Sequence, residues 1–305
     1  MPDPQIVHIT DAIHRAVTYL EASQSPNGEF PTYWSLSRNM SFPTYGGSPF
    51  ITGMILLALS SLGNEAPAII RRRGIDYLRT KRKENSYFAF FDQGIDCDLD
   101  DICLLNWLLQ SEDSDQARYK ALAEKIAGFP QRAGFYETWI RNDPNADNNV
   151  DPCVNVNVVR FLAYNGIRCD RTIQALRETL HSGTYVRGTF YYESGYALPY
   201  LIFTLPQSLR DAIVGVELQQ LRLPRLGPER PPFPIDIAMK LFIMSMCKRD
   251  ILTCSTLASD LLAREKPNGG WPSWAAFKAF NFWGSAELTT AIVAQALWHY
   301  RTLLL

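Results

Sequence analysis

The stretch Asp96-Cys97-Asp98-Leu99-Asp100-Asp101 runs straight into the apolar segment Ile102-Cys103-Leu104-Leu105-Asn106-Trp107-Leu108-Leu109. Four carboxylates at the start of an apolar helix repel one another, and partial burial also penalises their ionisation. The helix N-terminus favours negative charge by roughly 0.3–1 kcal/mol per group, which keeps some of the four ionised but not all. We therefore expect at least one carboxyl to hold its proton well above the ordinary pKa of aspartate. The alternative is a plain helix start, where acidic residues are common.

Internal repeats organise the chain around this stretch. Apolar helices are expected to start near residues 49, 98, 151, 196, 234 and 285, a period of roughly 38–53 residues that is typical of helical pairs. More polar helices are expected before them, at residues 8–23, 68–82, 116–126, 171–180, 207–220 and 251–264. The sequence thus predicts an all-α fold, a single (α/α)6 barrel of six helical pairs that occupies residues 1–305 as one domain. The proline-rich piece 223–234 is interpreted as a loop between helices.

Composition narrows the function classes. The 305-residue chain has a formal net charge of −1 with no basic bias, and we interpret its one short basic run, residues 71–73 with 81–83 nearby, as a solvated face. We therefore expect no nucleic-acid partner. The six cysteines are scattered without a C-x-x-C pair, which favours reduced thiols over a disulfide framework. No run of about 18 apolar residues occurs. We expect a soluble, cytoplasmic protein.

If the inner helices run parallel, their N-termini share one cavity. Asp98, Asp100 and Asp101 are the candidate catalytic residues there. The candidate substrate-binding residues are those expected around the same mouth: Asp96, Phe91, Trp107, Tyr136, Asp151, Asn155, Tyr192, Trp271, Trp274 and Trp283. For any single ring, core packing is the alternative. An acid beside aromatic walls could protonate an alkene or epoxide and hold the resulting carbocation, because aromatic faces stabilise cations without trapping them.

These residues carry a family resemblance. Asp98-Leu99-Asp100-Asp101 resembles the D-x-D-D motif of class II terpene cyclases. The turns at residues 24–30 and 266–271 resemble the Q-x-x-x-G-x-W repeats of the squalene–hopene cyclase and prenyltransferase β-subunit superfamily. The chain departs from the family at Ile102, where Thr is frequent, and it has length for one barrel where the cyclases usually carry two.

The resemblance implies a protonation-initiated cyclisation of a polyprenyl substrate. Asp100 would be the general acid, and Asp98 and Asp101 would hydrogen-bond to it and tune its acidity. The protonation needs no cofactor, although Mg²⁺ commonly helps where the substrate carries a diphosphate. The partner is then an isoprenoid small molecule. Peripheral membrane contact and a homodimer that closes the cavity are further options.

Other functions remain open at the level of sequence. A glycoside-active enzyme would pair Asp100 with Asp151 or Glu287 across a sugar. A zinc site would use Asp151 and Cys153 with His181 or His299, and a hard cation could bind to oxygens of the acidic residues Asp96, Asp98, Asp147 and Asp151. A non-catalytic isoprenoid-binding barrel is the remaining alternative.

Overall fold

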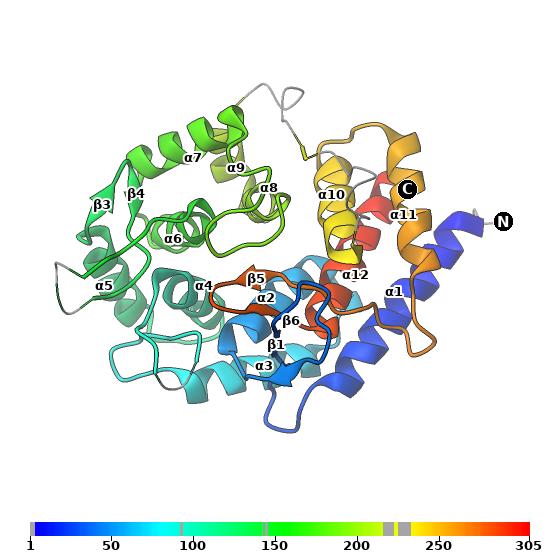
Figure 1. The fold of residues 1–305 in the computed structure, drawn as a ribbon, viewed down its shortest axis with the longest axis horizontal. Coiled ribbons are helices and arrows are strands. Elements are labelled where there is room, and N and C mark those ends of the chain that lie inside the picture. Colours follow the sequence, from blue (N-terminus) through cyan, green and yellow to red (C-terminus); the bar gives the residue numbers. More distant parts are fainter. Residues whose placement is uncertain (1–3, 92–93, 142, 144–145, 216–222, 225–232) are drawn as a thin grey trace.

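The computed structural model describes residues 4–91, 94–141, 143, 146–215, 223–224 and 233–305, and helices dominate it (Figure 1). The helices are α1 (Pro4–Ser23), α2 (Pro49–Leu59), α3 (Ala68–Lys81), α4 (Leu99–Gln110), α5 (Gln116–Ala127), α6 (Pro152–Tyr164), α7 (Asp170–Ser182), α8 (Ala197–Phe203), α9 (Gln207–Val214), α10 (Pro234–Met246), α11 (Ile251–Ala263) and α12 (Ala286–Leu304), with a 3-10 helix at Ser60–Glu65. The predicted all-α fold is confirmed as a mainly helical one, with a few short strands in addition.

The starts of the apolar helices follow from the local sequence. Pro49 and Pro152 occupy the first turns of α2 and α6, where the missing proline N–H costs nothing. Asp151 caps α6 by accepting a hydrogen bond from the Cys153 amide, and Ser285 caps α12 by accepting one from the Leu288 amide. Every residue of α2 is buried, as expected of a helix that is covered on both sides.

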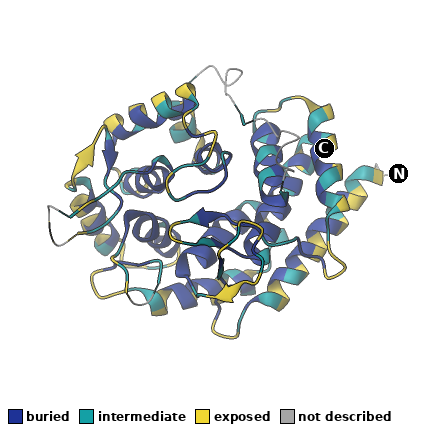
Figure 2. Cartoon of the chain, in the orientation of Figure 1, coloured by how far each residue is buried: buried dark blue, intermediate teal, exposed yellow. Residues whose placement is uncertain are grey.

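The buried helices follow one another around a ring. Helix α2 contacts α4, α4 contacts α6, α6 contacts α8, α8 contacts α10, α10 contacts α12, and α12 contacts α2. The remaining helices lie outside them, and each buries only one face (Figure 2). Residues of α1 pack against α12, so the two ends of the chain lie in the same region of the fold (Figure 1).

A small antiparallel sheet, which sequence analysis missed, joins the two ends of the chain. Its order is β2 (Thr44–Tyr45), β1 (Tyr33–Ser35), β6 (Phe282–Gly284), β5 (Phe277–Lys278). A β-bridge between Tyr192 and Phe277 ties this sheet to the segment before α8. The hairpin β3 (Gln131–Arg132) and β4 (Phe135–Tyr136) precedes α6. The sheet therefore stands over the same end of the helices as Tyr192.

Some sequence expectations extend beyond the described residues. The helix expected at 207–220 is described to Val214, and residues 216–220 lie outside the described part, as do 225–232 of the expected loop. Within the described ranges, no helix combines the length and the apolar character needed to cross a membrane.

Candidate active site

Asp98 fixes the start of α4. It is the N-cap residue, and its side chain accepts a hydrogen bond of 3.0 Å from the backbone amide of Asp101. The side chain is buried, and this burial raises its pKa while the hydrogen bonds to Asp101 oppose the shift. Asp98 is thus both a helix cap and a neighbouring charge for the two acids that follow it.

Asp100 lies between two hydrogen-bond donors from distant parts of the chain. Asn157 Nδ2 donates to its Oδ1 at 2.7 Å, and the Tyr192 hydroxyl donates to its Oδ2 at 2.7 Å. Burial raises the pKa of Asp100 to about 8, with the nearby charge of Asp98 as the second cause, although both hydrogen bonds lower it. At neutral pH this carboxyl is therefore mostly protonated, as a general acid must be.

Asp101 completes the acidic cluster and is almost fully buried. Burial raises its pKa well above the ordinary value, and the charge of Asp98 raises it further. The structure thus brings together the three acids that the sequence singled out as catalytic. The expectation that burial and charge repulsion would raise the pKa of at least one carboxyl agrees with the raised pKa of all three, and burial is the main cause in each.

Sequence analysis missed Asn157 and Arg160, both in α6; Asn157 contacts the acidic cluster directly, and Arg160 contacts Asn157. Arg160 is fully buried, donates from Nε to Asn157 Oδ1 at 3.3 Å, and donates to the Thr204 hydroxyl at 2.7 Å. Its guanidinium lies 5.0 Å from the ring centre of Trp107, within range of a cation–π interaction. The i, i+3 spacing of Asn157 and Arg160 on one helix was the available sequence signal.

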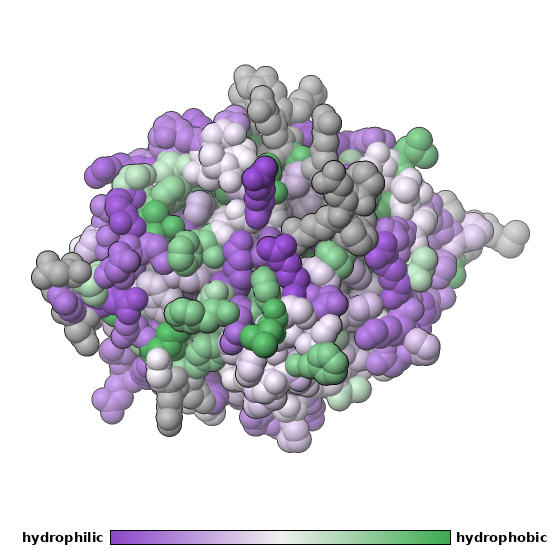
Figure 3. Space-filling model, viewed as in Figure 1, coloured by the Kyte–Doolittle hydropathy of each residue, from purple (hydrophilic) through white to green (hydrophobic). Residues whose placement is uncertain are grey.

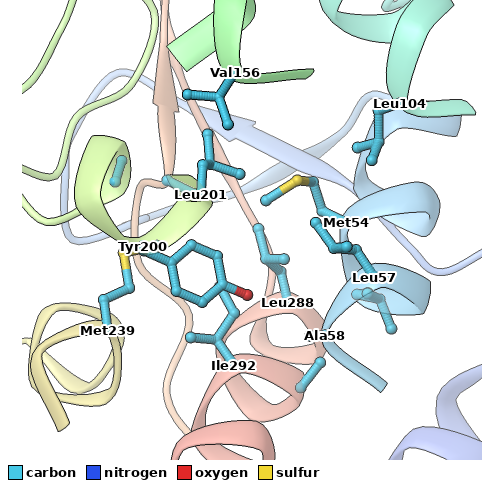
Figure 4. Packing of buried hydrophobic residues seen from close by; sticks show 14 of the residues in the cluster. Met54, Leu57, Ala58, Leu104, Val156, Tyr200, Leu201, Met239, Leu288 and Ile292 are labelled. Carbon is cyan, nitrogen blue, oxygen red and sulfur yellow. The ribbon is translucent and has the colours of Figure 1, made fainter. Parts of the chain in front are cut away.

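A small cavity lies among the inner helices beside Tyr192. It has a volume of about 10 Å³ and is lined by Met54, Tyr192, Ala197, Tyr200, Leu201, Met239, Ala276, Phe277, Leu288 and Ile292. Figure 4 shows Met54, Tyr200, Met239, Leu288 and Ile292 converging from different helices. A cavity of this size holds about one water molecule, so side chains must move before a larger molecule can enter.

Aromatic rings extend from this cavity toward the sheet. Tyr192 and Phe277 pack edge to face with 5.0 Å between ring centres, and Phe277 lies 6.4 Å from Phe90. Phe91 and Trp283 follow, with 4.6 Å between their rings. Of the predicted aromatic wall, the structure therefore connects Phe91, Trp283 and Tyr192 in one cluster.

Two other predicted binding residues, Asn155 and Asp151, form hydrogen bonds to nearby backbone groups. Asn155 accepts a hydrogen bond from the Tyr136 amide and donates to the Tyr136 carbonyl, so it holds β4 against α6. Burial raises the pKa of Tyr136 to about 12. Asp151 accepts hydrogen bonds from the backbone amides of Cys153 and Tyr191, and burial raises its pKa.

Three predicted residues have partners away from Asp100. Asp96 forms an ion pair with Arg141, and its side chain is 44% exposed. Trp271 is fully buried and donates its indole N–H to the Leu261 carbonyl at 2.8 Å. Trp274 stacks on Phe233. Trp271 and Trp274 thus have packing roles, and Asp96 forms a partly exposed ion pair.

The residues of the alternative zinc site do not converge. His181 is on α7 and shares a 2.7 Å hydrogen bond with the Arg177 carbonyl, while His299, on α12, packs against Phe242. Burial raises the pKa of the Cys153 thiol well above its ordinary value, which disfavours the thiolate that binds zinc. Among the described residues, no group of three His, Cys, Asp or Glu side chains is arranged to hold a metal ion.

Comparison with known proteins places this arrangement in context. No protein-family model matches the chain. A 160-residue part is 25% identical to the drimenol cyclase drtB of Aspergillus calidoustus, covering 52% of this chain and 30% of that protein. The chain therefore spans about a third of that relative.

Solved structures match over a larger share of the chain. A variant of the type II terpene cyclase MstE from Scytonema, in complex with geranylgeranyl dihydroxybenzoate as substrate, has a TM-score of 0.71 at 17% identity over 98% of this chain and 99% of that one. Another MstE variant, in complex with the product merosterolic acid A, has a TM-score of 0.71 at 15% identity over 99% of this chain and 100% of that one.

A larger enzyme matches in part. The ent-copalyl diphosphate synthase of Streptomyces platensis has a TM-score of 0.58 at 14% identity, over 82% of this chain and 50% of that one. At such low identity these likenesses concern the fold. In fold, this chain resembles the type II terpene cyclase MstE.

Proposed function

We propose that this protein is a class II terpene cyclase, an isomerase that starts a carbocationic cyclisation by protonating a polyprenyl substrate. The observation that carries the proposal is Asp100: a buried carboxyl with a pKa of about 8, held between Asn157 and Tyr192. Such a group keeps a proton at neutral pH and can give it to a weakly basic alkene when water is excluded. The likeness in fold to MstE supports the same reaction class.

The proposed first step moves one proton. Asp100 gives its carboxyl proton to the less substituted carbon of a terminal trisubstituted alkene, a C–H bond forms, and the tertiary carbon becomes the cation. The next double bond attacks this cation and closes a ring. Loss of a proton from carbon at the end restores the overall composition, so substrate and product are isomers. Asp100 then regains a proton from solvent.

The side chains around Asp100 have different roles in this step. The hydroxyl of Tyr192 and the amide of Asn157 hold both carboxyl oxygens, and they stabilise the carboxylate left after proton transfer. The negative charge of Asp98 raises the pKa of Asp100, which keeps Asp100 protonated before the substrate binds. Phe277 and the rings beyond it offer faces to the cation, each worth about 0.5–2 kcal/mol when desolvated.

The proposal also concerns the architecture. The ring of contacts from α2 to α12 supports an (α/α)6 barrel with the inner helices α2, α4, α6, α8, α10 and α12, and residues 1–305 would form one domain. The substrate would then occupy the bore beside Asp100. Because the cavity there is small, binding must push apart apolar side chains such as Met54, Met239 and Ile292.

The acidic stretch itself fits a divalent cation poorly. Burial raises the pKa of Asp98, Asp100 and Asp101, and protonated carboxyls are weak ligands for Mg²⁺. Asp96 is paired with Arg141. The proposed protonation therefore uses the proton of Asp100 and no metal ligand from this stretch.

An exposed apolar edge supports contact with a membrane that stores lipid-soluble substrate. Leu36 and Phe42 lie beside β1 and β2, Phe280 lies at the turn between β5 and β6, and all three are more than 80% exposed. Figure 3 shows apolar side chains on the face in view, which carries this sheet in Figure 1. Co-flotation with lipid vesicles should fall for Phe42→Ser/Phe280→Ser and stay unchanged for Leu252→Ser, an exposed apolar residue of α11.

Product analysis tests the proposal. The purified protein is incubated with farnesyl diphosphate, geranylgeranyl diphosphate, squalene and a prenylated dihydroxybenzoate, with and without Mg²⁺, and compared with Asp100→Asn by mass spectrometry. We expect cyclised isomers of at least one polyprenyl with the wild type and none with the variant. No product from any of them, together with cleavage of glycosides, would favour the carbohydrate-active alternative instead.

A further inference from the structure

Arg160 is a buried cation that reaches Asp100 through one intervening side chain. Its Nε donates to Asn157 Oδ1 at 3.3 Å, and Asn157 Nδ2 donates to Asp100 Oδ1 at 2.7 Å. All three side chains are at most 7% exposed. We propose that Arg160 is a positioning residue that orients the Asn157 amide and polarises it toward Asp100, so that Asp100 is a stronger acid at the moment of proton transfer.

The orientation part of the proposal follows from the geometry of an amide. Asn157 has an oxygen that accepts and a nitrogen that donates, and the two differ little in shape. Arg160 can only donate, so it selects the rotamer in which the Asn157 oxygen faces Arg160 and the nitrogen faces Asp100. Without Arg160, the amide could turn its oxygen toward the Asp100 carboxyl and accept the proton that the reaction needs.

The polarisation part follows from the low dielectric of the interior. Hydrogen bonds in a chain strengthen one another, and a buried charge acts more strongly than one in water. Burial lowers the pKa of Arg160 to about 10, so the guanidinium is still charged at neutral pH. A charged donor at one end of the chain strengthens the bond that stabilises the Asp100 carboxylate at the other end.

Arg160 is itself held in place from outside the acidic cluster. Thr204, at the end of α8, accepts from the guanidinium through both its hydroxyl, at 2.7 Å, and its carbonyl, at 3.2 Å. The ring of Trp107 in α4 packs on the guanidinium face. These contacts from α4 and α8 hold the guanidinium in the orientation in which its Nε donates to Asn157.

Other titratable groups also act on Asp100 and Arg160. Those that act on Asp100 are Asp98 and Asp101 from α4, Asp151 from the start of α6, and Tyr192. The charge of Asp100 also raises the pKa of the Cys103 and Cys153 thiols. Those that act on Arg160 are Tyr192, Asp100 and Tyr200 of α8.

The test compares pH profiles of kcat, and it rests on the proposed cyclisation. Arg160→Met should lower kcat by on the order of 10²-fold, leave KM nearly unchanged, and move the alkaline limb to higher pH by about one unit, because Asp100 loses a favourable charge. Leu176→Ala in α7, which packs beside α6, is the matched control for destabilisation. An unmoved limb in Arg160→Met, with a loss of Tm like that of the control, would overturn the proposal.

A double-mutant cycle tests whether Asn157 carries the effect. Asn157→Leu should shift the limb in the same direction, and Arg160→Met should add little to it in the double variant. Fully additive shifts would contradict a relay through Asn157. Arg160→Lys keeps the positive charge and serves as a second variant if Arg160→Met folds poorly. We expect the alkaline limb of Arg160→Lys to lie close to that of the wild type.

A readout without substrate separates this inference from the proposed function. ¹³C NMR of protein labelled at Asp carboxyls, with Asp100→Asn for assignment, reports the titration of Asp100 directly. We expect a higher titration midpoint in Arg160→Met whether or not the protein cyclises a polyprenyl. An unchanged midpoint would reject the role of Arg160 alone, whereas absence of cyclised product from the wild type would reject the proposed function alone.

Discussion

The hydroxyl of Tyr192 donates to Asp100 Oδ2 at 2.7 Å, although 92 positions separate the two residues. Tyr192 also lines the small cavity and pairs by a β-bridge with Phe277 of the sheet. One residue therefore contacts the proposed acid, the cavity and the sheet. Its position links proton transfer to the opening that the substrate needs.

Removal of the Tyr192 hydroxyl should weaken Asp100 as an acid. A hydrogen bond to a charged group is worth about 1.5–3 kcal/mol, so Tyr192→Phe should lower kcat by roughly 10- to 100-fold with little change in Tm. Tyr200→Phe is the matched control, because Tyr200 lines the same cavity but donates to Gln295. Equal losses in the two variants would show that the hydroxyl of Tyr192 has no special part.

The rate should fall as the pH rises through about 8. Asp100 must be protonated to act, its pKa is raised to about 8, and each pH unit above that value removes about nine-tenths of the acid form. A pH profile of kcat checks this limb. A rate that climbs through pH 8 would mean that the active group is a base and not Asp100.

Folding stability should depend on pH in the same sense. The raised pKa of Asp98, Asp100 and Asp101 means that the folded state binds protons more tightly than the unfolded chain does. Their contribution is complete below the ordinary aspartate pKa near 4 and is lost as the pH rises through the folded values. Tm measured from pH 5 to pH 9 should decline, and the decline should be shallower for Asp100→Asn.

Asp98 has two roles that two substitutions can separate. Asn is also a good N-cap, so Asp98→Asn should keep the stability of α4 while removing the charge that raises the pKa of Asp100. The alkaline limb should then move to lower pH. Asp98→Ala loses the cap as well and should lower the free energy of unfolding by about 0.5–2 kcal/mol in denaturant titrations. Equal stability of the two variants would contradict the capping role.

Phe277 should matter for the rate through the face of its ring. It lines the cavity and packs against Tyr192, so Phe277→Leu should slow cyclisation by about 2- to 30-fold and change the ratio of products. Gas chromatography with mass spectrometry measures both. Phe203→Leu is the control, since Phe203 is buried in α8 but faces Arg210. If Phe203→Leu changes the product ratio as strongly as Phe277→Leu does, the ring of Phe277 has no specific role in holding the cation.

The sequence predicted the helices because their starts carry local signals. Pro49 and Pro152 begin α2 and α6, and the acidic stretch before an apolar run marked the start of α4 near residue 98. The sheet was missed because its strands have only two or three residues, too few for an alternating pattern to appear. Its pairing joins residues near 34 and 283, which no local signal can relate.

Side-chain partners were the harder part of the site. Asn155 and Asn157 look alike in sequence, but two residues apart on a helix they face different ways. Asn155 holds Tyr136, whereas Asn157 reaches Asp100. Likewise Asp96 and Asp98 belong to one acidic run, yet Asp96 pairs with Arg141 before the helix begins. The rotation of α6 and the packing of the whole ring decide such contacts.

Deuterium transfer tests most directly whether Asp100 supplies the proton. The protein is equilibrated in D₂O and incubated with farnesyl diphosphate and geranylgeranyl diphosphate, and the products are analysed by mass spectrometry and NMR. We expect a cyclised product with one deuterium on the carbon next to the dimethyl-bearing carbon, which is the alkene carbon that Asp100 protonates, and no product with Asp100→Asn. A cyclised product without deuterium, or one formed equally by Asp100→Asn, would contradict it.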